Sequence, residues 1–212
     1  MFCSECGSQA QGKFCSNCGH PLAPAGPVSD DWENDVRYEA ILRVPEVRQV
    51  IDRHAKNAKQ GMSAETFLSI CEKVVDSPVS YGALAEIAQP LWAKAGVRTG
   101  KERAEEIMAP IGRTIARAVC SLAKNGQSVE SVEQGEGGCV LTAVLPSSIW
   151  AMKGELKVSC VRLEHGSLIG AETNIPGQMF DWGKSTSVLA QLFDDLRSDM
   201  GLPPSKQTRV AA

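Results

Sequence analysis

The chain has 212 residues, of which 43% are hydrophobic and 22% are charged, and its formal net charge is −3. This composition is ordinary for a globular protein, and the slightly acidic balance gives the molecule as a whole no electrostatic footprint for nucleic acid. No apolar run approaches the roughly 18 residues of a membrane span, so we expect no membrane segment.

The first 20 residues contain one cysteine motif twice. The pattern Phe-Cys-Ser-x-Cys-Gly begins at Phe2 and returns twelve residues later at Phe14. The four thiols that it brings together are those of Cys3, Cys6, Cys15 and Cys18. Four thiolates around one ion suit tetrahedral zinc, and the glycine after each second cysteine suits a tight turn. Because all four positions would be filled by protein ligands, such a site is structural rather than catalytic.

This segment resembles the bacterial zinc-ribbon family, which has two CxxCG knuckles. The resemblance covers about the first tenth of the chain. It implies one structural Zn²⁺ held by Cys3, Cys6, Cys15 and Cys18. The connection between the two pairs has eight residues, which is shorter than in the usual ribbon, so the hairpin between the knuckles would be minimal.

Other uses of these cysteines are less favoured. The motif begins at Cys3 and leaves no room for a secretory signal, so we expect a cytoplasmic protein whose thiols stay reduced. Rubredoxin-like knuckles bind a single iron with similar spacing, and we favour zinc over iron without excluding it. An iron–sulfur cluster more often shows a tighter run of three cysteines.

The composition along the chain divides it into four parts. We expect a zinc ribbon at 1–20, a proline-rich linker at 21–30, an α+β domain at 31–200 and a frayed tail at 201–212. The domain is long enough to bury a hydrophobic core without disulfides or structural metals. Its cysteines, expected to be buried free thiols, are Cys71, Cys120, Cys139 and Cys160.

From Asp30 to Gly126 the apolar residues recur with the period of a helix. Asp30 and Glu33 stand three apart, like a capping box, which predicts a helix start. Pro45 suits the first turn of a second helix, and His54 borders the apolar face of that helix.

Three more helices are predicted before Gly126. Ser63 can cap the first of them, and residues 80–95 contain the second. Thr99 opens a long helix that Pro110 should kink and that Asn125-Gly126 should end.

After Gly126 the period shifts toward two, which is typical of strands. Residues 127–134, 139–145, 156–160 and 169–173 are predicted strands, with a hairpin turn at His165-Gly166. A last helix has one apolar face, formed by Val188, Leu189, Leu192, Phe193 and Leu196. A helical half, an antiparallel meander and a closing helix predict an α+β fold.

The sequence around Gly183 resembles the end of a phosphate-binding loop, but five residues separate it from Gly177 where the Walker pattern has four. A weaker hypothesis is an anion or small-ligand site at Asp181, Lys184 and Ser185, at the start of the last helix. We favour the simpler reading, in which Asp181 or Ser185 caps that helix.

No HExxH, GxSxG or dinucleotide motif is present, and the three histidines lie far apart, so an enzyme is not favoured. The leading hypothesis is a non-catalytic zinc protein whose partner is another protein. The alternative is a nucleic-acid-associated factor, and it requires four basic side chains on one face: Arg48, Arg53, Arg113 and Arg117. A third hypothesis is a cleft near Asp181 and Lys184 that serves a small ligand or a reaction.

Overall fold

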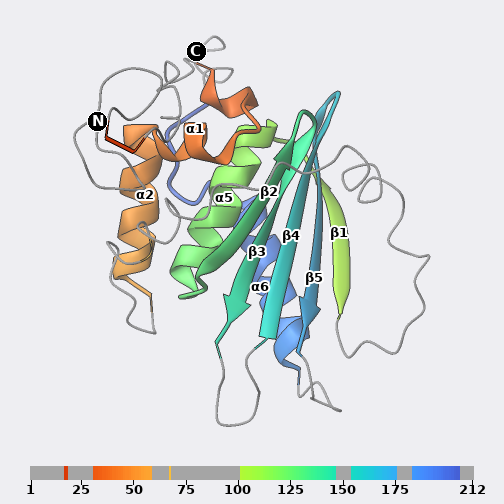
Figure 1. Ribbon diagram of the computed structural model, residues 1–212. Helices are drawn as coiled ribbons and strands as arrows, with labels where there is room; N and C mark the ends of the chain where they lie inside the picture. Colours follow the sequence, from red (N-terminus) through yellow and green to blue (C-terminus); the bar gives the residue numbers. More distant parts are fainter. Residues whose placement is uncertain are drawn as a thin grey trace.

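The computed structural model describes residues 17–18, 31–58, 67, 101–146, 154–175 and 183–205. Within these ranges helices accompany one antiparallel sheet, which confirms the α+β class (Figure 1). After a 3-10 turn at Trp32–Asn34 the elements are α1 (Tyr38–Leu42), α2 (Pro45–Lys56), β1 (Glu102–Ile107), α5 (Ile111–Lys124), β2 (Val129–Gly135), β3 (Gly138–Leu145), β4 (Gly154–Leu163), β5 (Gly166–Asn174) and α6 (Lys184–Arg197).

The sheet has the strand order β1-β5-β4-β3-β2, and all neighbours are antiparallel. Strands β2 to β5 form the predicted meander, and β1 is added beside β5. Alternation sets the register on β4, where Leu156 and Val158 are fully buried and Lys157 is exposed. The β4–β5 turn falls at Glu164 and His165, next to a Gly166 with φ of 121°, a conformation that favours glycine.

Helix α5 is the centre of the fold. Every residue from Ile111 to Ala123 is buried, because α1 and α2 pack on one side of the helix and β4 and β5 on the other. Most residues of this enclosed helix are small or apolar, and its buried Arg113 and Arg117 are paired with carboxylates of the chain. Gly112 is required for the contact with the 3-10 turn, since a Cβ there would lie 2.8 Å from Asp35 O and 2.9 Å from Glu33 O, with Trp32 O closer still.

Helix α6 closes the core with the face that the sequence predicts. Leu189, Leu192, Phe193 and Leu196 are buried, and the helix contacts α5, β1 and β5. Figure 1 shows α5 and α6 on the same side of the sheet, behind the strands in that view.

The predicted long helix from Thr99 through Pro110 is wrong. Residues Glu102–Ile107 form strand β1, paired with β5 over their whole length. Pro110 then precedes the first turn of α5 instead of kinking a helix. The sequence ERAEEI consists mostly of good helix formers, but pairing with β5 overrides that local preference.

The capping box at Asp30 and Glu33 is also wrong. Glu33 lies in the 3-10 turn with its side chain buried, and α1 begins at Tyr38 without a side-chain cap. In contrast, Pro45 does open α2, and α5 does end before Asn125-Gly126, where Gly126 has φ of 65°. Tertiary contacts of Glu33 therefore take the place of local capping.

The prediction of a frayed tail from residue 201 onward is wrong for residues 201–205, which pack against the domain. Leu202 is buried, and Pro203 O and the Ser205 hydroxyl both take part in hydrogen bonds with the domain. The predicted helices at 63–95 lie outside the described residues except for Phe67, which is helical and buried. The linker at 21–30 and the residues after 205 also lie outside them.

Candidate functional site

The predicted metal site lies largely outside the described residues. Cys3, Cys6 and Cys15 are not among them, whereas Asn17 and Cys18 form an exposed turn. A turn at the second cysteine of a CxxC pair fits a metal-binding knuckle. In the described part of the chain, no group of three or more histidine, cysteine or carboxylate side chains could hold a metal ion.

The anion site proposed at the start of α6 has a different geometry from the one expected. Lys184 Nζ donates to Pro146 O at 2.6 Å, and its desolvation lowers the pKa of Lys184 below the usual value. Ser185 is completely buried, and Gly183, with φ of 86°, precedes the helix without a side-chain cap. Asp181 lies outside the described residues. The lysine is thus engaged by a carbonyl of the chain itself.

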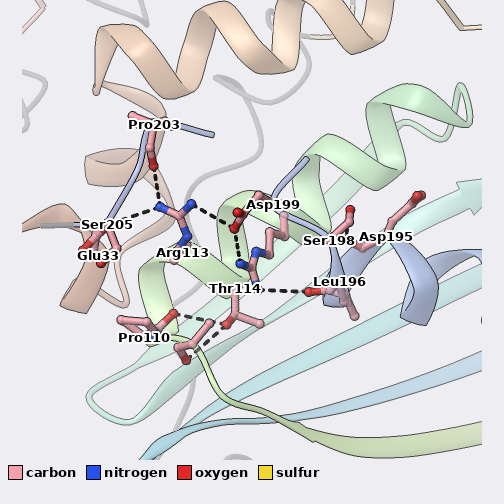
Figure 2. A network of polar contacts seen from close by, with 12 residues as sticks. Glu33, Pro110, Arg113, Thr114, Asp195, Leu196, Ser198, Asp199, Pro203 and Ser205 are labelled. Carbon is pink, nitrogen blue, oxygen red and sulfur yellow. Dashed lines mark hydrogen bonds and ion pairs between the residues drawn. The ribbon is translucent and has the colours of Figure 1, made fainter. Parts of the chain in front are cut away.

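A buried polar network joins α5 to both ends of the domain (Figure 2). Arg113 donates to Pro203 O at 2.6 Å and to Glu33 Oε1 at 3.2 Å. The side chains of Arg113 and Glu33 are only 4% and 6% exposed, so the two charges neutralise each other away from water. Ser205 completes the arrangement by donating to Glu33 Oε2 at 2.8 Å.

Asp199 bridges Arg113 to Arg117, one helical turn further along α5. Its Oδ1 accepts from Arg113 at 3.1 Å and from Arg117 at 2.7 Å. These two bonds hold the pKa of Asp199 below its usual value. Arg117 also donates to Leu196 O at 3.1 Å, at the C-terminal end of α6, where a positive charge is favoured.

The network continues along α5 through Asp195 of α6. This carboxylate accepts from Ser121 at 2.8 Å and from Lys124 at 2.7 Å, and Gln191 adds a third bond at 3.1 Å. The chain segment from α6 to Ser205 is therefore fixed against α5 by charge-assisted bonds, and the network serves the fold rather than a ligand.

The alternative hypothesis of a nucleic-acid-associated factor requires Arg113 and Arg117 to share one face with Arg48 and Arg53. The structure does not gather the four on one surface, because Arg113 and Arg117 are buried in the network while Arg48 and Arg53 are exposed on α2. The geometric condition set for the nucleic-acid hypothesis is not met.

Three of the four cysteines of the domain are described and are buried free thiols, as expected. Cys139 and Cys160 lie directly opposite each other on β3 and β4. A hydrogen bond between the two thiols, together with burial, raises the pKa of Cys139 well above its usual value. Burial raises the pKa of Cys120 to about 12. All three thiols pack as apolar groups, and the raised pKa values of Cys120 and Cys139 leave these two with little thiolate character at neutral pH.

Comparison with protein-family models, curated proteins and solved structures gives no match for this chain. Within the described residues, no helix has the length and apolar character needed to cross a bilayer.

Two groups of charged residues cannot be recognised from the sequence of any single element. The polar network joins α5 to residues more than 70 positions away, such as Arg113 to Glu33 and Lys124 to Asp195, and spacing within one helix does not reveal it. The acidic residues of β1 were assigned to a helix. The sequence ERAEEI has no alternation of apolar and polar residues, so no signal within β1 identifies it as a strand.

Proposed function

We propose that this chain is a non-catalytic protein-interaction module, in which a small metal-binding segment at 1–20 presents a binding surface and the α+β domain provides a stable body. The observation that carries the proposal is the repeated FCSxCG motif, which places Cys3, Cys6, Cys15 and Cys18 at ligand spacing. One structural Zn²⁺ is the cofactor, and the cytoplasm is the compartment. The partner is another protein.

The proposed metal has a thermodynamic role. A segment of about 20 residues whose main apolar side chains are Phe2 and Phe14 cannot bury enough surface to fold by itself. Binding of zinc by four thiolates supplies on the order of 10 kcal/mol at neutral pH in such small sites. The folded state of the segment, and the surface that it offers a partner, would therefore exist only with metal bound.

The described domain supports this division of roles. Its interior charges, Glu33, Arg113 and Asp195, are engaged by partners within the chain, so they stabilise the body rather than carry out a reaction. The free thiols of Cys139 and Cys160, which lie opposite each other without a disulfide, are consistent with a reducing compartment.

The proposal is tested by comparing proteins captured by the intact chain and by the Cys15→Ser variant, each cross-linked in cell extract and purified under denaturing conditions. We expect one or more partners to be lost from Cys15→Ser and kept by Ser16→Ala, a neighbouring substitution that leaves the four thiols in place. Capture of the same partners in the same amounts by Cys15→Ser would contradict a function that depends on the metal-binding segment.

A further inference from the structure

The two edges of the sheet differ in how they are protected. Strand β2 contains a bulge between Val129 and Ser131, and its Gln134 side chain accepts from the backbone N–H of Tyr38 at 2.9 Å. Strand β1, in contrast, keeps one register with β5 over all six residues and contains neither proline nor glycine. Figure 1 shows β1 at the opposite edge from β2. Regular, uncovered edge strands are natural templates for another strand.

The hydrogen-bond pattern identifies which residues of β1 face outward. Thr173 N donates to Lys101 O at 2.9 Å, so this pair is of the hydrogen-bonded kind. Because the two kinds of pair alternate along an antiparallel ladder, residues 103, 105 and 107 bond to β5. Glu102, Ala104 and Glu106 then direct their N–H and C=O groups away from the sheet, and in the described part of the chain no element pairs with that edge.

The same three residues carry the exposed side chains of β1. Glu102, Ala104 and Glu106 are all exposed, and they lie on the face of the sheet away from α6. Glu102 stands directly opposite Glu172 of β5 in a non-hydrogen-bonded pair, where side chains approach most closely. Like charges in that position destabilise the sheet. Lys157 of β4 lies opposite Glu172 on its other side, and a cation beside Glu102 would compensate the carboxylate at the edge.

The other face of β1 holds the strand in place. Arg103 lies over the ring of Phe193, with 4.7 Å from its Cζ to the ring centroid, and it donates from Nε to Glu105 at 2.7 Å. Arg197 of α6 binds both oxygens of Glu105 at 2.7 Å. The strand is thus anchored by its inward residues, while its outward backbone and its outward carboxylates have no partner within the described residues.

A second copy of this chain is a poor occupant of the edge. An antiparallel pair of β1 strands centred on Ala104 would set Glu102 against Glu106 twice. Moving the centre by one residue would set Arg103 against Arg103 or Glu105 against Glu105. Each of these registers places like charges directly opposite, which is destabilising. The Arg103–Glu105 pairs of the first register involve side chains that are already engaged with α6.

We propose that the free edge of β1 binds an extended segment of a partner protein that carries Lys or Arg at two positions four residues apart. Backbone hydrogen bonds to residues 102, 104 and 106 would give affinity, and the two basic side chains facing Glu102 and Glu106 would give specificity. A small or apolar residue fits between them, opposite Ala104. The inference rests on the proposed function in one respect, since it names a binding surface on a chain that acts through protein partners.

The test uses the full chain and a labelled peptide with the core Lys-Thr-Val-Thr-Lys, followed by fluorescence anisotropy. We expect saturable binding that weakens as salt is raised and at least tenfold weaker binding of the same peptide with glutamate in place of both lysines. Glu102→Gln combined with Glu106→Gln should weaken binding tenfold or more. Glu164→Gln, an exposed carboxylate in the β4–β5 turn, should leave it unchanged.

A backbone variant separates strand addition from simple charge attraction. Ala104→Pro removes an outward N–H but no bond to β5, so it should abolish binding while the circular dichroism spectrum and thermal transition stay near those of the parent chain. If this variant does not fold, the same peptide methylated on the backbone nitrogens that would face β1 replaces it, and strand addition requires this peptide not to bind the parent chain. The inference would be overturned if the parent chain showed no saturable binding. It would also be overturned if the Glu102→Gln, Glu106→Gln double variant bound the peptide as tightly as the Glu164→Gln control.

Failure of this inference can be told apart from failure of the proposed function. Cys15→Ser should keep the peptide affinity, because β1 belongs to the domain and not to the cysteine segment. A parent chain that binds the peptide but is purified without any zinc would retain the edge site and refute the metal-dependent role. A chain with zinc that captures its partner but does not bind the peptide would refute the edge site alone.

Discussion

The charged residues of α5 and those of β1 differ in how their charges are compensated. Arg113 and Arg117 lie in the interior and have carboxylates and carbonyl oxygens within 3.2 Å. Glu102 and Glu106 lie on an exposed edge, and the charge nearest to Glu102 across the strand pair is another glutamate. An unpaired charge in the interior strongly destabilises the fold, whereas an unpaired charge at an exposed edge is tolerated and can interact with a partner.

The largest effect is expected from breaking the interior network. Arg113→Ala removes the cation beside the buried Glu33 carboxylate and releases Pro203 and Asp199. Loss of one member of a buried ion pair costs about 3–5 kcal/mol. We expect urea unfolding to show a decrease of that size in the free energy of unfolding.

The control is Arg43→Ala, an exposed arginine at the end of α1, which should change the free energy of unfolding by less than about 0.5 kcal/mol. Equal effects of the two substitutions would remove the distinction between interior and surface charge.

The approach of the 3-10 turn to α5 is the packing that places Glu33 beside Arg113. Gly112→Ala would put a Cβ within 2.9 Å of both Glu33 O and Asp35 O, and overpacking against backbone costs about 1–3 kcal/mol. Gly137→Ala, where a Cβ meets nothing within 4 Å, is the matched control and should be nearly neutral. Thermal unfolding that ranks Gly137→Ala as the more damaging change would contradict the packing described.

The network also predicts how the free energy of unfolding falls at acid pH. The bonds from Arg113 and Arg117 lower the pKa of Asp199, so the folded state favours its carboxylate. The contribution is complete above the unfolded pKa of about 3.9 and is lost as pH falls through the lower folded value. Because the Asp199 side chain is 72% exposed, we expect less than about 1 kcal/mol. Asp199→Asn should reduce the slope below pH 4, and an unchanged slope would contradict this assignment.

The smallest effect is expected at the edge. Glu102→Lys replaces the repulsion with Glu172 by an attraction and should stabilise the chain by about 0.2–1 kcal/mol, with the gain screened by salt. Glu164→Lys, in an exposed turn, is the control and should show no such gain. Destabilisation by Glu102→Lys at low salt would show that the glutamate pair carries no repulsive cost. We infer that Glu102 contributes to binding of the basic peptide, so Glu102→Lys should also bind this peptide less tightly.

Much of the fold follows from the sequence because the deciding signals are local. The alternation in β4 and β5 and the apolar face of α6 survive unchanged in the structure. The assignment of β1 failed because ERAEEI favours a helix locally and becomes a strand only through β5, more than 60 residues away.

The candidate functional residues could be predicted from the sequence to different extents. The four cysteines are recognisable from spacing alone, since ligand geometry restricts the spacing of the motif. Arg113 and Arg117 resemble a solvated basic face in sequence, and their burial depends on how Glu33 and Asp199 fold against α5 from both ends of the domain. The outward direction of Glu102 and Glu106 depends on the register with β5, which the sequence of β1 does not contain.

The central claim concerns the metal, and metal content measured by elemental analysis of the purified full chain tests it most directly. The account predicts one zinc per chain, lost in Cys15→Ser together with protease resistance of the segment before Pro27 and kept in Ser16→Ala. Thermal unfolding of the domain should be the same in all three proteins. One iron per chain in place of zinc would contradict the proposed cofactor. Absence of any metal, with Cys3, Cys6, Cys15 and Cys18 freely alkylated in the native protein, would contradict the claim altogether.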